Sequence, residues 1–434
     1  MLIAGCGGET PTPGTTTGGT GSTGVTTSTT GTGSATGSNL SGKLEMFSWW
    51  TTGGEAAGLK ELYKLYTQQN PNVNIVNSAS AGGAGQNAKA ILKNRMQNGD
   101  PPDSFQVHMG HELIDGYVAA GQVENLDSLY QSEGWTKAFP QGVLDIVSST
   151  GADGVKHYWS VPVNIHRANV LWYNKKVFTD NNLQPPTTFD EFFKVADTLK
   201  AKGIYALALG DKDSFAAPHL FEAILVGTLG ADGWKGLWTG ATKWDDPKVT
   251  TALNTFKQML GYINPDHASL SWDQANDEVI AGKAAMTIMG DWANADYVAK
   301  KFTDYGWINS PGTKGIYDAL SDTFALPKGA KDRDNAIAWL KLAGSQPGQD
   351  VFNPLKGSIP ARIDAGKANY NDYLKSAMVD WSKDTIVPSV VHGAAAKDSW
   401  VKDYSDAVNA FVTKQDVAAT QSQLVTAASN AMTK

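Results

Sequence analysis

The chain has 434 residues, enough for two domains with hydrophobic cores of their own. Its net charge of −7 argues against a nucleic-acid partner, because phosphate binding needs a basic surface. The sequence has no apolar run of the roughly 18 residues that a membrane-spanning helix needs, and its one cysteine excludes a disulfide framework and a Cys-ligated metal site.

That cysteine, Cys6, comes first in chain order, after an apolar pair and two small residues. This pattern resembles the cleavage site of bacterial lipoprotein signals. The resemblance implies that Cys6 becomes the first mature residue and carries acyl chains, each buried methylene of which adds about 0.8 kcal/mol of membrane affinity. We therefore interpret residues 1–6 as the remaining part of a lipoprotein signal. The alternative is a buried or incidental thiol, which fits poorly with the segment that follows.

Residues 7–42 consist almost entirely of Gly, Ser, Thr and Pro, with one charged residue and no aromatic residue. Such a composition cannot bury enough apolar surface to offset the entropy lost on ordering. We expect a flexible tether with an end-to-end distance of roughly 30–35 Å.

Strands and helices alternate in the part of the chain that follows. The expected elements are a strand over 43–48, a helix with apolar residues at 59, 62, 63 and 66, a strand over 73–76, a helix over 86–97 and a strand over 104–108. This β-α-β-α-β order predicts a mainly parallel sheet with helices on both faces.

A second block of elements begins near residue 159. The expected elements are a strand over 168–173, a helix from a capping box at Thr188 and Glu191 to about 202, a strand over 205–209, a mainly helical stretch over 218–303, a strand end at 324–327, a helix over 334–342 and a mostly helical C-terminal part. The sequence shows no internal repeat.

Several catalytic motifs are absent. We find no His-Glu-x-x-His, no phosphate loop ending in Gly-Lys-Ser/Thr and no Gly-x-Ser-x-Gly, and the seven histidines lack the spacing of a metal site. We therefore expect neither a metal nor another cofactor.

Two polar motifs follow neighbouring strands of the first predicted sheet. Trp49, Trp50 and Glu55 come after the first strand, and Gln106 and His108 end the third. Ligands of open α/β sheets bind at the carboxyl ends of the strands. Each motif alone is equally compatible with core tryptophans and a surface acid, but together they favour a site. The fourteen tryptophans point weakly to sugars, whose C–H faces pack on indole rings.

Further motifs, in a constant order, carry a resemblance to a known family. The general ones are Val161-Pro162, Trp172-Tyr173-Asn174-Lys175, 186–192 and 281–292; the narrower ones are Trp49-Trp50 with Glu55, Gln106-Val107-His108, Leu270-Ser271-Trp272, Ser321-Asp322, 352–358 and Val391-His392-Gly393. From about residue 43 onward the chain resembles the carbohydrate-binding family of ABC-importer solute-binding proteins, and most narrowly the glucose/galactose-binding proteins.

The resemblance implies a receptor that binds a monosaccharide, glucose or galactose, and delivers it to the membrane permease of an ABC importer. The roles it implies are a ring sandwich by Trp50 and Trp272, cleft walls from Trp49 and Trp292, acceptors at Glu55 and Asp322, and donors at Gln106, His108, Lys356 and His392. His166 is expected to be structural or to lie on the surface. The receptor is expected to be a monomer, outside the cytoplasm and anchored through Cys6.

The resemblance also implies a type II periplasmic-binding-protein fold, an α/β fold of two lobes joined by a hinge. Each lobe is expected to hold a mainly parallel sheet flanked by helices. The N-terminal lobe is predicted at 43–156 plus 315–350, and the C-terminal lobe at 157–314 plus 351–434. The ligand is expected between the lobes, where contact with both stabilises the closed form.

Two other classes of protein remain as alternatives. An exported glycoside hydrolase would use Glu55 and Asp322 as its carboxylate pair, one of them an acid with a raised pKa. A cell-wall or lectin-like module would instead bind polymers at an open, shallow site. The family motifs argue against both.

Overall fold

The computed structural model describes residues 39–433, so Cys6 and most of the predicted tether lie outside the described residues. These residues belong to one structural unit. Within 39–433 no helix has both the length and the apolar character required to cross a membrane.

A five-stranded sheet forms the N-terminal part of this unit, in the order β2-β1-β3-β13-β6. Its strands are β1 (Gly42–Phe47), β2 (Val73–Asn77), β3 (Ser104–His108), β6 (Ser160–Pro162) and β13 (Asp322–Ala325). β1 pairs in parallel with β2 and β3, whereas β13 is antiparallel to both β3 and β6. Because β6 joins this sheet, residues just beyond the predicted lobe boundary at 156 pack with the N-terminal strands.

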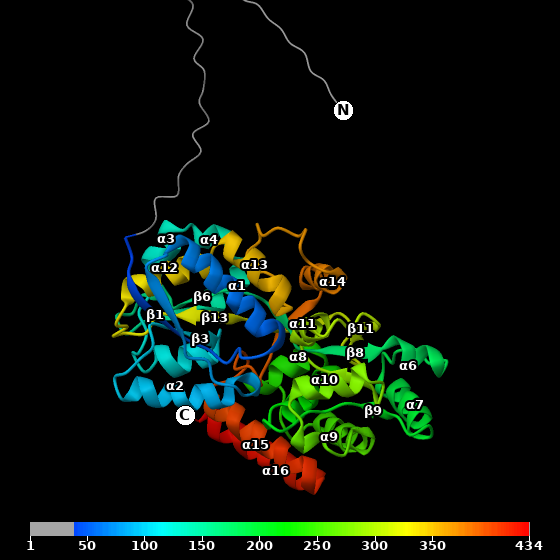
Figure 1. The fold of residues 1–434 in the computed structure, drawn as a ribbon. Coiled ribbons are helices and arrows are strands. Elements are labelled where there is room, and N and C mark those ends of the chain that lie inside the picture. The colour runs from blue at the N-terminus through cyan, green and yellow to red at the C-terminus, as the bar shows by residue number, and fades with distance from the viewer. Residues whose placement is uncertain (1–38, 434) are drawn as a thin grey trace, which may run out of the picture. The chain divides into compact units, whose positions relative to one another are not determined.

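Helices cover both faces of this sheet. Figure 1 shows α1 (Gly53–Gln69), α12 (Arg333–Ala343) and α13 (Gln346–Lys356) on one side and α2 (Gln86–Gln97) on the other. The predicted apolar stripe of α1 is buried at Leu59, Leu62 and Tyr66. All five residues of β3 are buried, as expected for a strand covered on both faces.

A second sheet has the order β11-β8-β10-β9. Its strands are β8 (Val170–Asn174), β9 (Tyr205–Leu207), β10 (Ala284–Ile288) and β11 (Tyr305–Asn309), with α6 (Lys175–Asp180), α7 (Phe189–Lys200) and α10 (Trp272–Ile280) packed around it. The predicted capping box of α7, Thr188 with Glu191, is present. The prediction of a mainly helical stretch over 218–303 is wrong for β10. Its Ala-Ala-Met sequence favours a helix, but all five residues are buried between β8 and β9.

A small third sheet has the order β14-β12-β7. The chain runs through this sheet each time it crosses between the other two sheets. It consists of β7 (His166–Arg167), β12 (Ile316–Leu320) and β14 (Thr385–Pro388). The chain passes from the five-stranded sheet to this one between 162 and 166, and returns between 320 and 322. The sheets are therefore mixed rather than mainly parallel, because strands returning from distant parts of the chain run antiparallel to their neighbours.

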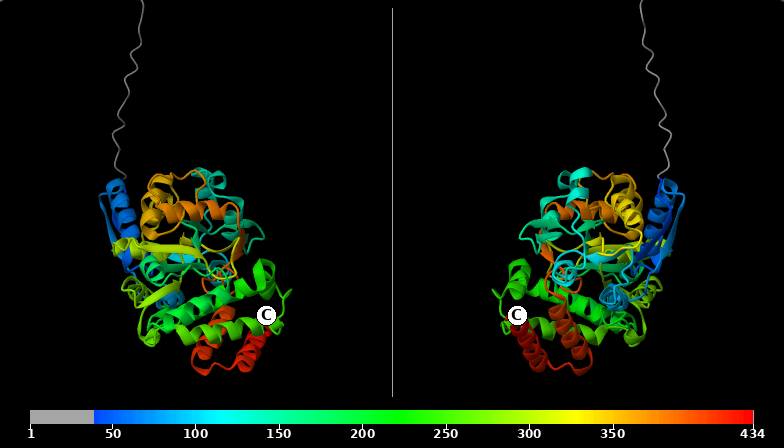
Figure 2. Two further views of the ribbon diagram at one scale, coloured as in Figure 1. Left: turned by 90° about the vertical axis from the view of Figure 1, so that its right-hand side faces the viewer. Right: turned by 90° about the vertical axis from the view of Figure 1, so that its left-hand side faces the viewer.

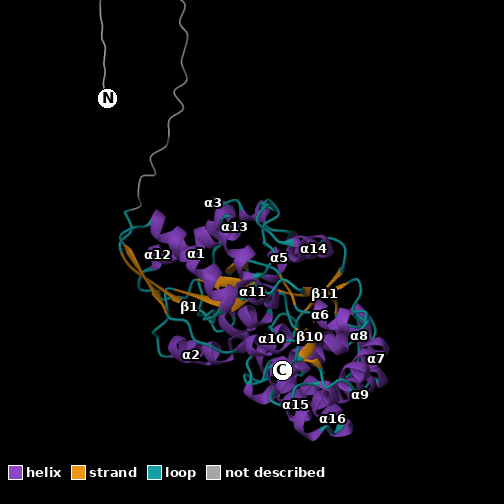
Figure 3. Cartoon of the chain, turned by 45° about the vertical axis from the view of Figure 1, so that its right-hand side comes forward, coloured by secondary structure: helices purple, strands orange, loops and turns teal. Residues whose placement is uncertain are grey.

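The remaining helices complete the described part of the chain. They are α3 (Asp127–Ser132), α4 (Trp135–Ala138), α5 (Gln141–Ile146), α8 (Ala216–Thr239), α9 (Pro247–Met259), α11 (Trp292–Ala299), α14 (Asp372–Trp381), α15 (Asp398–Lys414) and α16 (Val417–Met432), with single turns η1 (Gly83–Gly85), η3 (Leu260–Tyr262) and η4 (His267–Ser269), the π-helix η2 (Glu112–Val118) and the hairpin β4 (Ser148–Thr150) and β5 (Lys156–Tyr158). Figure 2 shows α15 and α16 side by side in red, and Figure 3 shows β1 at the edge of the cartoon, between the labels of α12 and α2.

Candidate functional site

A cavity with about 390 Å³ of empty space, open solvent at its mouth included, is lined by strands of the five-stranded sheet and the small third sheet and by the N-terminal ends of α10 and α11. Charged, imidazole and indole side chains from distant parts of the chain surround it. Its lining residues are Trp49, Glu55, Gly82, Gly83, Ala84, His108, His166, Phe215, Trp272, Trp292, Leu320, Asp322, Lys356 and His392.

One wall of the cavity is the edge at which β1 and β3 end and β13 begins. Asp322 pairs with His108 across the antiparallel ladder. Gln106 lies behind them, where its Nε2 donates to Asp322 Oδ1 at 2.7 Å and its Oε1 accepts from the backbone N–H of Trp49 at 3.2 Å. The amide of Gln106 therefore holds the Asp322 carboxylate and the Trp49 backbone in place.

The ammonium group of Lys356 is the charge centre of the cavity. Lys356 ends α13, and its side chain is only 2% exposed. Its Nζ donates to Glu55 Oε1 at 2.8 Å and lies 3.9 Å from Asp322 Oδ2. Burial opposes the charged form, but these two carboxylates raise the pKa of Lys356 above its usual value. The lysine is therefore charged at neutral pH.

Asp322 is also fully ionised at neutral pH. Burial opposes its ionisation, but Lys356 and His166 hold the pKa of the Asp322 carboxyl far below its usual range. The Asn164 side-chain amide donates to its Oδ2 at 2.8 Å. The carboxylate is thus a fixed, charged hydrogen-bond acceptor at the cavity wall.

Tight packing sets the position of Glu55. It lies in the first turn of α1, whose N-terminus is wedged between α11 and α13. A Cβ on Gly54 would lie 2.3 Å from the backbone oxygen of Leu355 and equally close to the Cβ of Ala295, so only glycine fits there. This close approach brings Glu55 within reach of Lys356.

His166 reaches the cavity from β7. Its Nε2 lies 2.9 Å from Lys356 Nζ and 3.4 Å from Asp322 Oδ2, and its Nδ1 bonds the buried Asp291 carboxylate. Burial and the Lys356 charge oppose protonation of the ring, but the Asp291 and Asp322 carboxylates outweigh them and raise the pKa of His166 above its usual value. His166 thus extends the charge network from the N-terminal sheet to the loop before α11.

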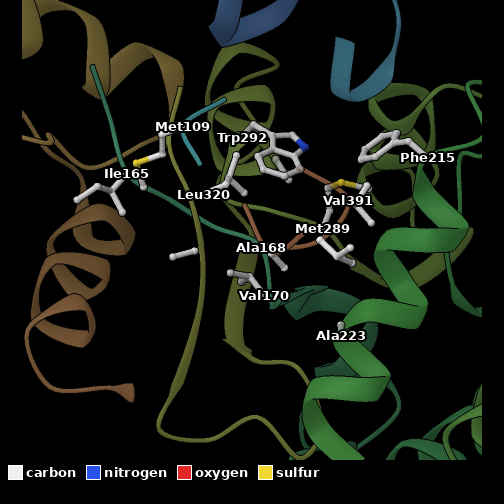
Figure 4. Packing of buried hydrophobic residues seen from close by; sticks show 14 of the residues in the cluster. Met109, Ile165, Ala168, Val170, Phe215, Ala223, Met289, Trp292, Leu320 and Val391 are labelled. Atoms are coloured by element: carbon white, nitrogen blue, oxygen red, sulfur yellow. The ribbon is translucent and has the colours of Figure 1, made fainter. Parts of the chain in front are cut away.

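Aromatic rings form the remaining walls. The Trp49 ring lies 4.9 Å from that of His108, and the Trp292 ring lies 5.2 Å from that of His392. Trp272 begins α10 behind a capping box and is partly exposed. Figure 4 shows Trp292, Leu320 and Phe215 within the buried hydrophobic cluster, which continues beneath the cavity.

Residues 49–350 match the family model described as bacterial extracellular solute-binding protein. The chain belongs to this family. An uncharacterized ABC transporter extracellular-binding protein of Pyrococcus horikoshii is 37% identical over 392 residues, covering 89% of this chain and 87% of the relative. A probable sugar-binding periplasmic protein of Rhizobium meliloti is 30% identical over 376 residues, covering 83% of this chain and 87% of the relative.

The solved structure of the bacterial solute receptor AcbH, described as having an exclusive preference for β-D-galactopyranose, is similar with a TM-score of 0.79. The match has 20% sequence identity and covers 91% of this chain and 99% of that one, and at this identity it shows the fold alone. The α/β fold and its two-lobed architecture, predicted from the sequence motifs, are confirmed by these comparisons.

The solute-binding protein brings most of the predicted site residues to one cavity. Those that line it are Trp49, Glu55, His108, Trp272, Trp292, Asp322, Lys356 and His392. Gln106 lies behind the wall and acts through Asp322 and Trp49.

The structure differs from the prediction that Trp50 packs against a sugar ring. Trp50 is 1% exposed and packs on Phe324 and Phe352, and Lys356 Nζ lies 5.4 Å from its ring centre. It lines a separate and larger surface hollow beside α1, and not the cavity that holds Lys356. The chain bends at Trp49 just after β1, so that the Trp49 ring lines the cavity while the Trp50 ring packs into the core.

Some lining residues did not figure among the predicted ones. They are Gly82, Gly83, Ala84, His166, Phe215 and Leu320. The run of glycines after β2 could have pointed to this part of the cavity, because glycine is needed where the backbone passes close to another group. A Cβ on Gly83 would lie 2.4 Å from the Phe215 ring. No local pattern distinguishes His166, which was expected to be structural or to lie on the surface.

Acid titration provides a test of the network behind His108. Glu112 is 1% exposed, and its Oε2 lies 2.7 Å from both His108 Nδ1 and Lys89 Nζ. Burial opposes ionisation, but Lys89 and His108 lower the pKa of Glu112 from 4.5 to about 2. The ionised group therefore stabilises the fold above pH 4.5, and this contribution, about 3 kcal/mol, is lost as the pH falls toward 2.

We expect Glu112→Gln to lower the free energy of unfolding at pH 7, and the difference from the parent protein to shrink as the pH falls from 4.5 to 2.5. Urea unfolding at several pH values measures both. The control is Glu61→Gln, since Glu61 forms an exposed pair with Lys64 and such pairs contribute about 0–1 kcal/mol. A difference that stays constant with pH would contradict the assigned ion network.

Proposed function

We propose that this solute-binding protein is the sugar receptor of an ABC importer, and that it binds one monosaccharide, glucose or galactose, in the cavity between its sheets. The observation that carries the proposal is the convergence of Lys356, Glu55 and Asp322 with three tryptophans on one small cavity. The description of the Rhizobium relative as a probable sugar-binding protein supports the substrate class.

The chemistry of the lining fits a pyranose. A monosaccharide has a ring of hydroxyl groups and two weakly apolar faces, and indole rings pack against such faces while charged groups bond the hydroxyls. Trp49, Trp272 and Trp292 supply the indole surfaces in our proposal.

We further propose that the parts built on the five-stranded and four-stranded sheets are the two lobes. β6 and α13 pack with the N-terminal strands and helices, so the N-terminal lobe includes them in addition to 43–156 and 315–350. A sugar that touches both lobes favours the closed form. The permease would recognise that form.

Membrane attachment is part of the same proposal. Acyl chains on Cys6 and the Gly/Ser/Thr-rich tether over 7–42 would keep a monomeric receptor close to its permease. A tether of this kind raises the effective concentration of the receptor at the permease. Radiolabelled palmitate incorporation, lost in Cys6→Ala, is the expected result in cells that express the full chain.

The hydrolase alternative has weaker support. A glycosidase needs a carboxyl group with a raised pKa as its general acid. The pKa of Asp322 is lowered, and Glu55 is paired with Lys356. Turnover of chromogenic glycosides would favour the hydrolase.

Isothermal titration calorimetry with a panel of monosaccharides and disaccharides tests the proposed function. We expect saturable heat with glucose or galactose. Trp272→Ala is expected to weaken binding about tenfold or more with little change in melting temperature, because this partly exposed indole would stack on the sugar. The control is Trp381→Ala, a partly exposed tryptophan that packs on Tyr317 away from the cavity. No heat with any hexose would contradict the proposal.

A further inference from the structure

Glu222 on α8 is a fully buried carboxylate next to the loop that carries His392. Its Oε1 accepts from the backbone N–H of Val390 at 3.2 Å, and its Oε2 accepts from that of Val391 at 3.0 Å. Burial raises the pKa of Glu222, and the polar side chains of Asp318 and Ser389 beside it oppose that rise. A carboxylate has about four lone-pair sites, so Glu222 can accept from both of these side chains in addition to the two backbone N–H groups.

Asp318, in the middle of β12, is the protonated partner of Glu222. It is 1% exposed, and among the described residues no N–H or O–H group of another residue reaches either of its oxygens. Two contacting buried carboxyl groups share one proton, since like charges at that distance repel strongly. Burial and Glu222 raise the pKa of Asp318 well above its usual value. Because both Glu222 oxygens accept backbone N–H groups, the proton lies on Asp318.

Ser389 connects this pair to the cavity. Its Oγ lies 2.8 Å from His392 Nδ1. When the Ser389 hydroxyl donates to Glu222, its oxygen accepts the proton of His392 Nδ1. Burial, and then His108 and His219, lower the pKa of His392 well below its usual value, so the ring is neutral. A neutral ring with its proton on Nδ1 has a lone pair on Nε2.

We propose that Glu222, Asp318 and Ser389 are positioning residues that fix His392 as the Nδ1–H tautomer, so that its Nε2 accepts a hydrogen bond from a sugar hydroxyl. The inference rests on the proposed function, and it reverses the donor role predicted for His392. It also identifies one sugar hydroxyl as a donor to the protein, whereas the hydroxyl nearest Lys356 is an acceptor.

The surroundings of the pair contain few other charges. Arg167 of β7 faces Asp318 and is itself paired with Asp380 at 2.7 Å and Asp384 at 3.3 Å. Tyr404 of α15 faces both carboxyl groups and donates its hydroxyl to the backbone oxygen of Pro218. The rings of His219, on α8, and His108, on β3, each lie within 6 Å of the His392 ring. The charges of Lys89 and Asp322 also act on His392, and Glu112 contacts Gly393 of the same loop.

Removal of the shared proton at alkaline pH would place two carboxylates in contact. Their repulsion would displace the Val390–Val391 backbone, and with it His392. We therefore expect sugar affinity to fall when the pH is raised far enough to remove this proton. Asp318→Asn keeps a donor toward Glu222 that cannot ionise, so this variant is expected to lose that alkaline fall.

Glu222→Gln is the decisive variant. A glutamine amide has one accepting oxygen and one donating nitrogen. It therefore leaves one of the two backbone N–H groups without an acceptor and no longer accepts from Ser389. We expect sugar affinity at pH 7 to fall at least tenfold and to be lower than that of Asp318→Asn. The matched control is Asp103→Asn, a buried carboxylate before β3 that also accepts two backbone N–H groups, from Glu45 at 2.7 Å and Asp332 at 2.8 Å. That variant is expected to lose stability but to keep its affinity.

A readout without ligand separates this inference from the proposed function. Nitrogen-15 NMR of histidine-labelled protein distinguishes a protonated from an unprotonated ring nitrogen, and the His392 signals are assigned by their loss in His392→Ala. We expect the Nδ1–H tautomer in the parent protein and a mixture of tautomers in Glu222→Gln. An Nε2–H tautomer in the parent, or equal affinities and pH profiles for Glu222→Gln and Asp318→Asn, would overturn the inference. Absence of sugar binding combined with the expected NMR result would overturn the proposed function alone.

Discussion

Replacement of Lys356 with Met is expected to abolish detectable sugar binding and to lower the free energy of unfolding by about 3–5 kcal/mol, the usual cost of removing one partner of a buried ion pair. The ammonium group is buried between Glu55, Asp322 and His166. Without it, the Asp322 carboxylate loses the cation that compensates for its burial. The pKa of Asp322 should therefore rise.

Urea unfolding measures the stability change, and calorimetry measures the loss of binding. The matched control is Lys331→Met, because Lys331 forms a pair with Asp100 in which both side chains are more than half exposed. A change within about 0.5 kcal/mol is expected there. A Lys356→Met protein that binds sugar like the parent would show that the cavity is not the binding site.

Gly83→Ala is expected to weaken sugar binding by about 1–3 kcal/mol, the usual cost of overpacking. The added Cβ would lie 2.4 Å from Cδ1 of Phe215, which contacts Gly83 from the far side of the cavity. The backbone of Gly83 is not in the left-handed region, so alanine adds no backbone strain there. The substitution therefore tests this single contact, which would join the two lobes in the proposed arrangement.

A double-mutant cycle with Phe215→Ala gives the contact energy. Phe215→Ala alone should also weaken binding, since Phe215 lines the cavity, but the two effects should not add because the smaller side chain leaves room for the new methyl group. Gly142→Ala in α5 is the control, because its Cβ would meet no atom within 4 Å. Strictly additive effects would show that Gly83 and Phe215 do not meet in the bound protein.

We could predict from the sequence those elements whose formation depends only on residues within the element itself. The stripe of α1 and the capping box of α7 lie within single elements, so the sequence order alone reveals them. β10 was missed because its burial between two other strands outweighs the helix preference of its residues. Strand direction in the mixed sheets likewise depends on where distant segments return.

The same distinction applies to the site: the sequence indicates which residues line it, but not the role of each. Residue types and family motifs identified Asp322, Lys356 and His392 as lining candidates, although their hydrogen-bond roles depend on neighbours far away in the sequence. His166 gains its role from Lys356, 190 positions later. The choice between Trp49 and Trp50 depends on how the chain leaves β1, and the motif is the same whichever ring faces the cavity.

The place of β13 in the five-stranded sheet has a consequence for biosynthesis. β13 lies between β3 and β6, and the hydroxyl of Thr323 bonds the backbone oxygen of Val107, 216 positions earlier. Until the ribosome has released residue 325, β3 and β6 have no strand between them, and the sheet exists only as separate pieces. Contacts over such separations form slowly. The nascent chain therefore stays without its finished N-terminal sheet through most of its synthesis, which leaves time for an export machinery to engage it unfolded.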